Sequence, residues 1–112
     1  MPEKEMLVTL SAGSAELLIC RRLQGAKDGT VLSDRKVIET AAGKCTILVF
    51  SRLFKRAASV FALTVAIEPG AGATKIMWSA QSGSKGLPVV GNLGAAESFE
   101  KKLVSALERY RA

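Results

Sequence analysis

Apolar residues dominate the chain between residues 44 and 82, where three stretches are predicted to form strands. They read KCTILVFSRLF, ASVFALTVAI and TKIMWSAQS. β-Branched and aromatic residues dominate them, and such residues fit a pleated surface. Since side chains in a strand alternate between two faces, Phe61, Leu63, Val65 and Ile67 share one face of the middle strand. These large residues are expected to meet helices. The three stretches predict an antiparallel meander.

The rest of the chain supplies two helices and further strands. The pattern predicts a strand over 5–10, a helix over 15–23, a strand over 30–40, a short edge strand over 87–90 and a helix over 95–109. Polar residues in the middle of the 30–40 strand place it at an edge or at a bend. The order β-α-β-β-β-β-α predicts one two-layer α+β domain over 1–112, a mostly antiparallel sheet with both helices packed on one face.

The second face of the meander is also short of polar residues. An antiparallel sheet with one solvated face normally alternates cleanly, and here the alternation is blurred. It can reflect ordinary irregularity, the wall of a ligand cavity or a subunit interface. The interface hypothesis predicts a homodimer. Its candidate residues are Leu48, Phe50, Val60, Ala62, Thr64 and Ala66.

Composition restricts the classes of function. Hydrophobic residues make up 48% of the chain, which argues against disorder. The net charge of +6 permits binding to anions, but the basic residues come as scattered pairs and aromatic residues are only 5%. Nucleic-acid binding is therefore disfavoured. The mixed-charge start of the chain and the absence of a long apolar run predict a cytoplasmic protein without membrane contact.

Little of the chemistry used by enzymes is present. The chain has no histidine, so the commonest general base and metal ligand is missing. Its two cysteines, Cys20 and Cys45, form no metal-binding pair and no disulfide framework. Ser82 and Lys85 have the Ser-x-x-Lys spacing of some serine enzymes, but they lie in a glycine-rich loop without companion motifs. We predict no catalytic residue, no cofactor and no metal.

A glycine-rich loop and the start of the last helix form a candidate anion-binding region. Backbone N–H groups of such loops and of helix N-termini can bind anions. The candidate residues are Ser82, Gly83, Ser84, Lys85 and Gly94.

Three stretches together resemble a small bacterial family of unknown function, DUF6054. Residues 47–52 are similar to its Val-x-Val-x-Glu-Arg-Tyr run, and residues 59–65 are similar to its Ser-Leu-x-Val-Thr-Leu strand. The third stretch combines Ser82–Ser84, similar to its Ser-Gly-Gly-Ser loop, with Gly94–Phe99, similar to its Gly-x-Glu-x-Phe helix entry. Ser51 departs from the pattern, which often has Glu there. The resemblance covers residues 44–107. It implies the α+β layout and no activity.

Three functional hypotheses remain open. The first is a non-enzymatic module that self-associates or binds a small apolar or anionic ligand. The second is a helix-grip-like ligand binder or lyase, with a cavity under the C-terminal helix. The third is nucleic-acid binding through a basic surface, which would weaken steeply with salt.

Overall fold

The computed structural model of the chain describes residues 4–24, 30–41, 43–54, 59–83 and 93–112. Its elements are β1 (Glu5–Val8), α1 (Ala12–Gln24), β2 (Val31–Thr40), β3 (Gly43–Phe54), β4 (Ser59–Pro69), β5 (Thr74–Gly83) and α2 (Leu93–Glu108). This β-α-β-β-β-β-α order is the one that the sequence pattern predicts. The additional strand predicted over 87–90 lies outside the described residues.

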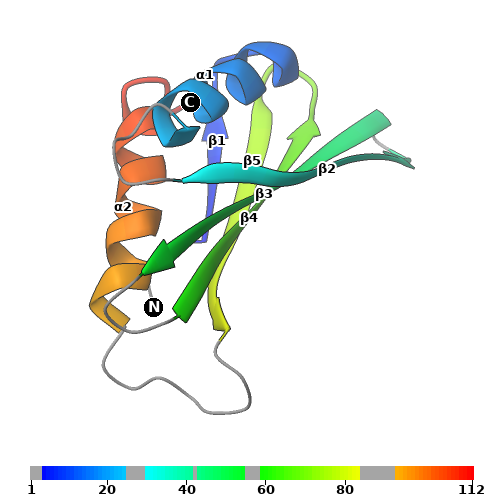
Figure 1. The fold of residues 1–112 in the computed structure, drawn as a ribbon. Coiled ribbons are helices and arrows are strands. Elements are labelled where there is room, and N and C mark those ends of the chain that lie inside the picture. Colours follow the sequence, from blue (N-terminus) through cyan, green and yellow to red (C-terminus); the bar gives the residue numbers. More distant parts are fainter. Residues whose placement is uncertain (1–3, 25–29, 42, 55–58, 84–92) are drawn as a thin grey trace.

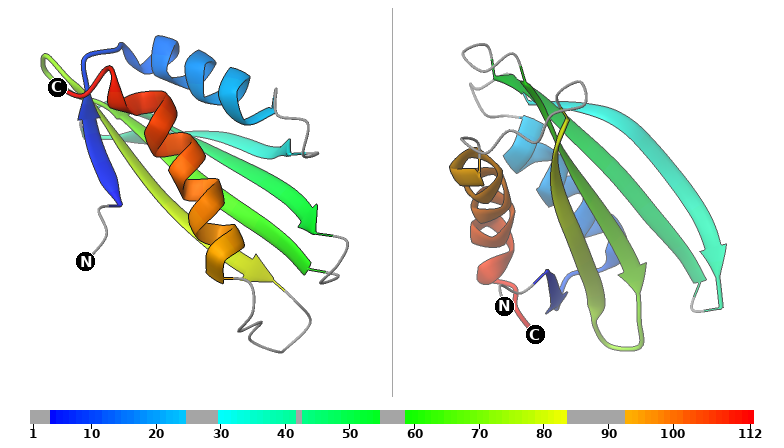
Figure 2. Two further views of the ribbon diagram at one scale, coloured as in Figure 1. Left: turned by 90° about the vertical axis from the view of Figure 1, so that its left-hand side faces the viewer. Right: turned by 90° about the horizontal axis from the view of Figure 1, so that it is seen from below.

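The five strands form one antiparallel sheet in the order β1-β5-β4-β3-β2, so β4 is its central strand. Both helices lie on the same side of this sheet (Figures 1 and 2). The predicted α+β class, with two helices on one face of an antiparallel sheet, is confirmed.

The hydrophobic core lies between the sheet and the helices. In β4 the large residues point toward the helices, as their period of two predicts. The register places Leu48 opposite Val65 and Phe50 opposite Leu63, so the same face continues into β3. The fully buried core side chains are Val8, Ala15, Ile19, Leu48, Phe50, Leu63, Val65, Ile67, Ile76, Leu103 and Leu107.

Helix α1 has a local reason to begin and a buried stripe that holds it to the sheet. The Ser11 hydroxyl oxygen accepts a hydrogen bond from the backbone N–H of Ser14 at 3.2 Å, as an N-cap side chain does. Ala15, Ile19 and Leu23 recur every four residues and are buried. The stripe therefore faces the sheet, and the basic residues of α1 remain at its outer surface.

The two edges of the sheet differ. Strand β2 is an edge strand, as predicted, and its pairing with β3 is irregular between Leu32 and Asp34. At the other edge, residues near the C-terminus cover β1. The Thr9 N–H donates to the Tyr110 carbonyl and the Ala112 N–H to the Leu7 carbonyl, both at 2.8 Å.

Candidate functional site

The face of the sheet turned away from the helices carries a group of apolar side chains among polar positions such as Lys36 and Ser79, and none of the described elements covers it (Figure 2, right). We call this surface the open face. The register of β2 to β5 brings together eight of its side chains, which are Ile38, Cys45, Ile47, Val49, Ala62, Thr64, Ala66 and Met77. Within one chain Cys45 is buried, Ile38 is 45% exposed, and the other six are partly exposed.

Strand β4 explains the shape of the open face. Its large side chains point to the helices, which leaves the small Ala62, Thr64 and Ala66 on the other side. Ile47 lies opposite Ala66 and Val49 opposite Thr64, on the neighbouring strand β3. On the other side, Met77 of β5 lies opposite Ala66 and the polar Ser79 lies opposite Thr64. Larger apolar residues therefore flank the small residues along β3. Such a surface can pack closely against another flat surface.

Two of the predicted interface residues do not lie on the open face. Leu48 and Phe50 are 0% exposed and belong to the core beneath the helices. Their placement was wrong because β3 is apolar in both phases, so its pattern alone does not show which phase continues the helix-facing side of β4. The register decides this, and it puts Ile47 and Val49 on the open face instead.

The remaining predicted interface residues do share this face. Ala62, Thr64 and Ala66 lie along the centre of it, and the position of Val60 falls on the same side by its pairing with Leu53 and Gly83. Whether this face binds a second chain stays a prediction. The period of two separates Ile47 and Val49 from Leu48 and Phe50, but it does not show which pair shares a face with Ala62 and Thr64.

The open face is close to electrically neutral, although the chain carries a net charge of +6. By register, its described charged side chains are the basic Lys36 and Lys75 and the acidic Glu5, Asp34 and Glu68. Lys75 and Glu5 form an ion pair at 3.0 Å. The described residues of the open face therefore contribute nothing to the excess of positive charge.

The predicted anion-binding residues are only partly placed. Ser82 and Gly83 end strand β5, and Gly94 lies in the first turn of α2. Ser84 and Lys85 lie outside the described residues. Anion binding by this region stays a prediction.

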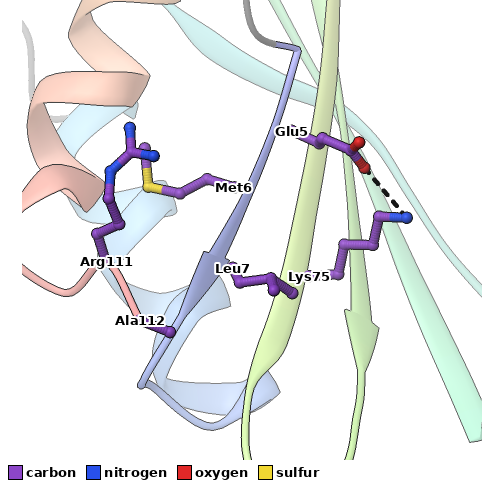
Figure 3. A pocket seen from close by; sticks show the side chains of 6 residues that line it. All are labelled: Glu5, Met6, Leu7, Lys75, Arg111 and Ala112. Atoms are coloured by element: carbon purple, nitrogen blue, oxygen red, sulfur yellow. Dashed lines mark ion pairs between the residues drawn. The ribbon is translucent and has the colours of Figure 1, made fainter.

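A pocket of about 420 Å³ lies at the β1 edge and was not predicted from the sequence. Figure 3 shows the side chains that line it, which are Glu5, Met6, Leu7, Lys75, Arg111 and Ala112. They come from β1, β5 and the C-terminal residues, three segments that only the fold brings together.

Both cations of this pocket have carboxylate partners. A hydrogen bond to Glu5 raises the pKa of Lys75, and a hydrogen bond from Arg111 lowers the pKa of Glu108. Lys75 therefore keeps its proton near neutral pH and is a poor nucleophile. The pocket is a neutral, partly apolar hollow, and this gives it no evident catalytic role.

The space between α2 and the sheet is where a helix-grip-like cavity would lie. Leu103 and Leu107 of α2 are fully buried there, and Trp78 of β5 is 4% exposed. The Trp78 Nε1 is buried without a hydrogen-bond partner. A buried N–H donor without a partner costs free energy. Among the described residues, a bound hydrogen-bond acceptor would satisfy this donor.

Other chemistry has little support in the described part of the chain. No three Cys, Asp or Glu side chains lie close enough together to hold a metal ion. Among the same residues, no helix combines the length and the apolar character needed to cross a membrane.

The two cysteine thiols are expected to react slowly. Burial raises the pKa of both Cys20 and Cys45, and nearby Glu16 and Glu68 add to the two effects respectively. Because the thiolate is the reactive form, we expect each thiol to react with a disulfide reagent at pH 7.5 about tenfold or more slowly than a cysteine peptide. Single variants Cys20→Ala and Cys45→Ala assign the two rates. A rate equal to that of the peptide would contradict the burial.

The same shifts set a direction for the pH dependence of stability. A raised pKa means that the folded state holds the thiol proton more tightly than the unfolded chain does. The free energy of unfolding should therefore fall as pH rises above the ordinary thiol pKa of 9.0. Removing both thiols should reduce this fall.

Comparison with known proteins assigns no family to this chain. No protein-family model matches it, and a search of curated proteins returned no match. The resemblance to DUF6054 therefore stays a prediction, and the function has to be argued from the geometry above.

Proposed function

We propose that this protein is a non-enzymatic module that forms a homodimer through the open face. The observation that carries the proposal is the apolar side of the sheet left without a covering layer. An apolar face of a sheet is normally buried against another layer of the structure. A second copy would supply the missing layer.

The size of the open face suits this role. Its four long strands have ten to twelve residues each. With strands about 4.8 Å apart and about 3.3 Å per residue, ten residues of four strands cover about 600 Å² of flat sheet. A stable interface buries about 800 Å² of accessible surface per partner. Because side chains project from the flat sheet, the accessible surface of the open face is larger than its flat area and comes close to that of a stable interface.

The charge distribution favours a second copy over an oppositely charged partner. Two identical chains of net charge +6 repel each other on average. On the open face, however, basic Lys36 and Lys75 are balanced by acidic Glu5, Asp34 and Glu68. This is a surface on which two copies can approach each other with little repulsion.

The edge of the sheet is a poorer route to assembly. β2 is long enough to pair with another strand, but it carries Asp34, Arg35 and Lys36 in succession, beside the irregularity at Ser33. Charged residues and bulges are ways in which proteins prevent edge pairing. We therefore favour a dimer in which two open faces stack over one in which two β2 edges pair.

Native mass spectrometry of the freshly purified protein tests the proposal. We expect a dimer without additional mass. A monomer at micromolar concentration and above would overturn the proposed self-association.

A second candidate function rests on Trp78. Its buried Nε1 has no partner, so a small molecule with a hydrogen-bond acceptor could occupy the region under α2. The same spectrum distinguishes this ligand-binding function. A monomer with a retained adduct favours it, and a clean dimer favours the open-face module.

A further inference from the structure

A groove between the two helices collects positive charge from distant parts of the chain. Helices α1 and α2 pack against each other on the outer side of the molecule (Figure 2, left). The groove has a volume of about 270 Å³. It is lined by Arg22 of α1, by Lys102, Ser105 and Ala106 of α2, and by Arg109, which directly follows α2. We call it the interhelix groove.

The α2 side of the interhelix groove is regular. Lys102 and Ser105 are three residues apart, so they project from one side of α2, and Arg109 follows in the turn directly after it. Ala106 lies between them and is nearly buried. Its short side chain leaves room below the longer ones. Donor groups therefore surround a small apolar floor.

Three described carboxylates of α1 and α2 have partners outside the interhelix groove. In α1, Glu16 pairs with Arg35 of β2 at 2.8 Å, and in α2, Glu100 pairs with Lys4 at 2.6 Å. Glu108 pairs with Arg111 at 3.1 Å. None of these three side chains lines the interhelix groove. The described lining is therefore basic with no acidic member.

We propose that the interhelix groove binds the phosphate group of a small phosphorylated molecule. The guanidinium groups of Arg22 and Arg109 and the Ser105 hydroxyl supply donors from two sides, and charge-assisted hydrogen bonds from arginine suit phosphate oxygens. Arg109 also lies over the Tyr110 ring, with its guanidinium carbon 5.6 Å from the ring centroid.

The size and surroundings of the groove favour a small ligand. Pockets for whole drug-sized molecules hold about 300–1,000 Å³, so this groove suits the phosphate with little of the attached group. Arg22 lies two residues before the end of α1, where the partial negative charge of the helix dipole favours cations and disfavours anions. All of the attraction for phosphate must therefore come from side chains.

Titration of the ¹⁵N-labelled protein with inorganic phosphate and with glucose 6-phosphate, at constant ionic strength, tests this proposal. We expect saturable chemical-shift changes that centre on the groove. Replacing Arg22 or Arg109 by Gln should weaken binding about tenfold or more, since each removes charge-assisted hydrogen bonds.

Neighbouring residues provide matched controls. Arg21→Gln and Lys101→Gln remove the same charge from the same two helices, but neither side chain lines the groove. They should change the dissociation constant less than about twofold, as expected for screened surface charges. Equal weakening by the groove and control variants would overturn the proposal, because it would indicate attraction by net charge alone.

Two further arms separate the sources of phosphate. Binding to phosphatidylglycerol vesicles or to a short DNA duplex, without saturable binding of inorganic phosphate or glucose 6-phosphate, would overturn the small-molecule site. None of the groove residues lies on the open face, so failure here leaves the proposed dimer standing. If the protein proves to be monomeric, the phosphate site can still be tested in the monomer.

Discussion

The Thr64→Lys variant is expected to raise the dissociation constant of the proposed dimer by about 100-fold or more. Thr64 lies at the centre of the open face, on the central strand of the sheet. An unpaired ammonium group buried there loses its hydration, and such a group costs several kcal/mol in an apolar contact. A 100-fold change corresponds to about 2.8 kcal/mol. Sedimentation velocity over a range of concentrations measures it.

The control for this variant adds the same charge to the other side of the molecule. Leu17 of α1 is 55% exposed and lies on the helix layer, so Leu17→Lys should leave the dissociation constant unchanged. Circular dichroism should show both variants folded, because Thr64 is only partly buried within one chain. If Thr64→Lys remains as dimeric as the parent protein, the open face is not the interface.

The sequence pattern was enough to predict the architecture, because the signals for its elements are local. The apolar spacing of α1, the alternation in β4 and the polar middle of β2 each come from a few adjacent residues. Element boundaries moved by one to three residues, as in α1, predicted over 15–23 and observed over Ala12–Gln24. The capping contact of Ser11 with Ser14 explains the earlier start of this helix.

The candidate sites were harder to predict, because they depend on which segments meet. Period-two alternation divides β3 into two faces, but only the register with β4 shows that Val49, and not Phe50, accompanies Thr64. The interhelix groove shows the same difficulty. Arg22 and Arg109 lie at opposite ends of the sequence, and only the packing of α1 on α2 joins them in one groove.

The faces of β3 can be separated by experiment, since Val49 and Phe50 are adjacent in sequence but lie on opposite sides of the sheet. Phe50 is fully buried in the core, so Phe50→Ala should lower the free energy of unfolding by about 3–5 kcal/mol. This loss should be the same at every protein concentration at which the protein is monomeric. Chemical denaturation followed by circular dichroism measures it.

Val49→Ala is the matched variant, and its effect should depend on assembly. Val49 is partly exposed in one chain, so its truncation should cost the monomer less than about 1 kcal/mol, well below a buried large-to-small change. If the open face is the interface, the variant should lose further stability where the parent protein is dimeric, since association stabilises the folded state by mass action. A small effect of Phe50→Ala, or a Val49→Ala effect as large as that of Phe50→Ala in the monomer, would contradict the observed register. If the loss of stability in Val49→Ala is small and does not depend on protein concentration, the register of β3 would stand. The proposed dimer through the open face would then be contradicted.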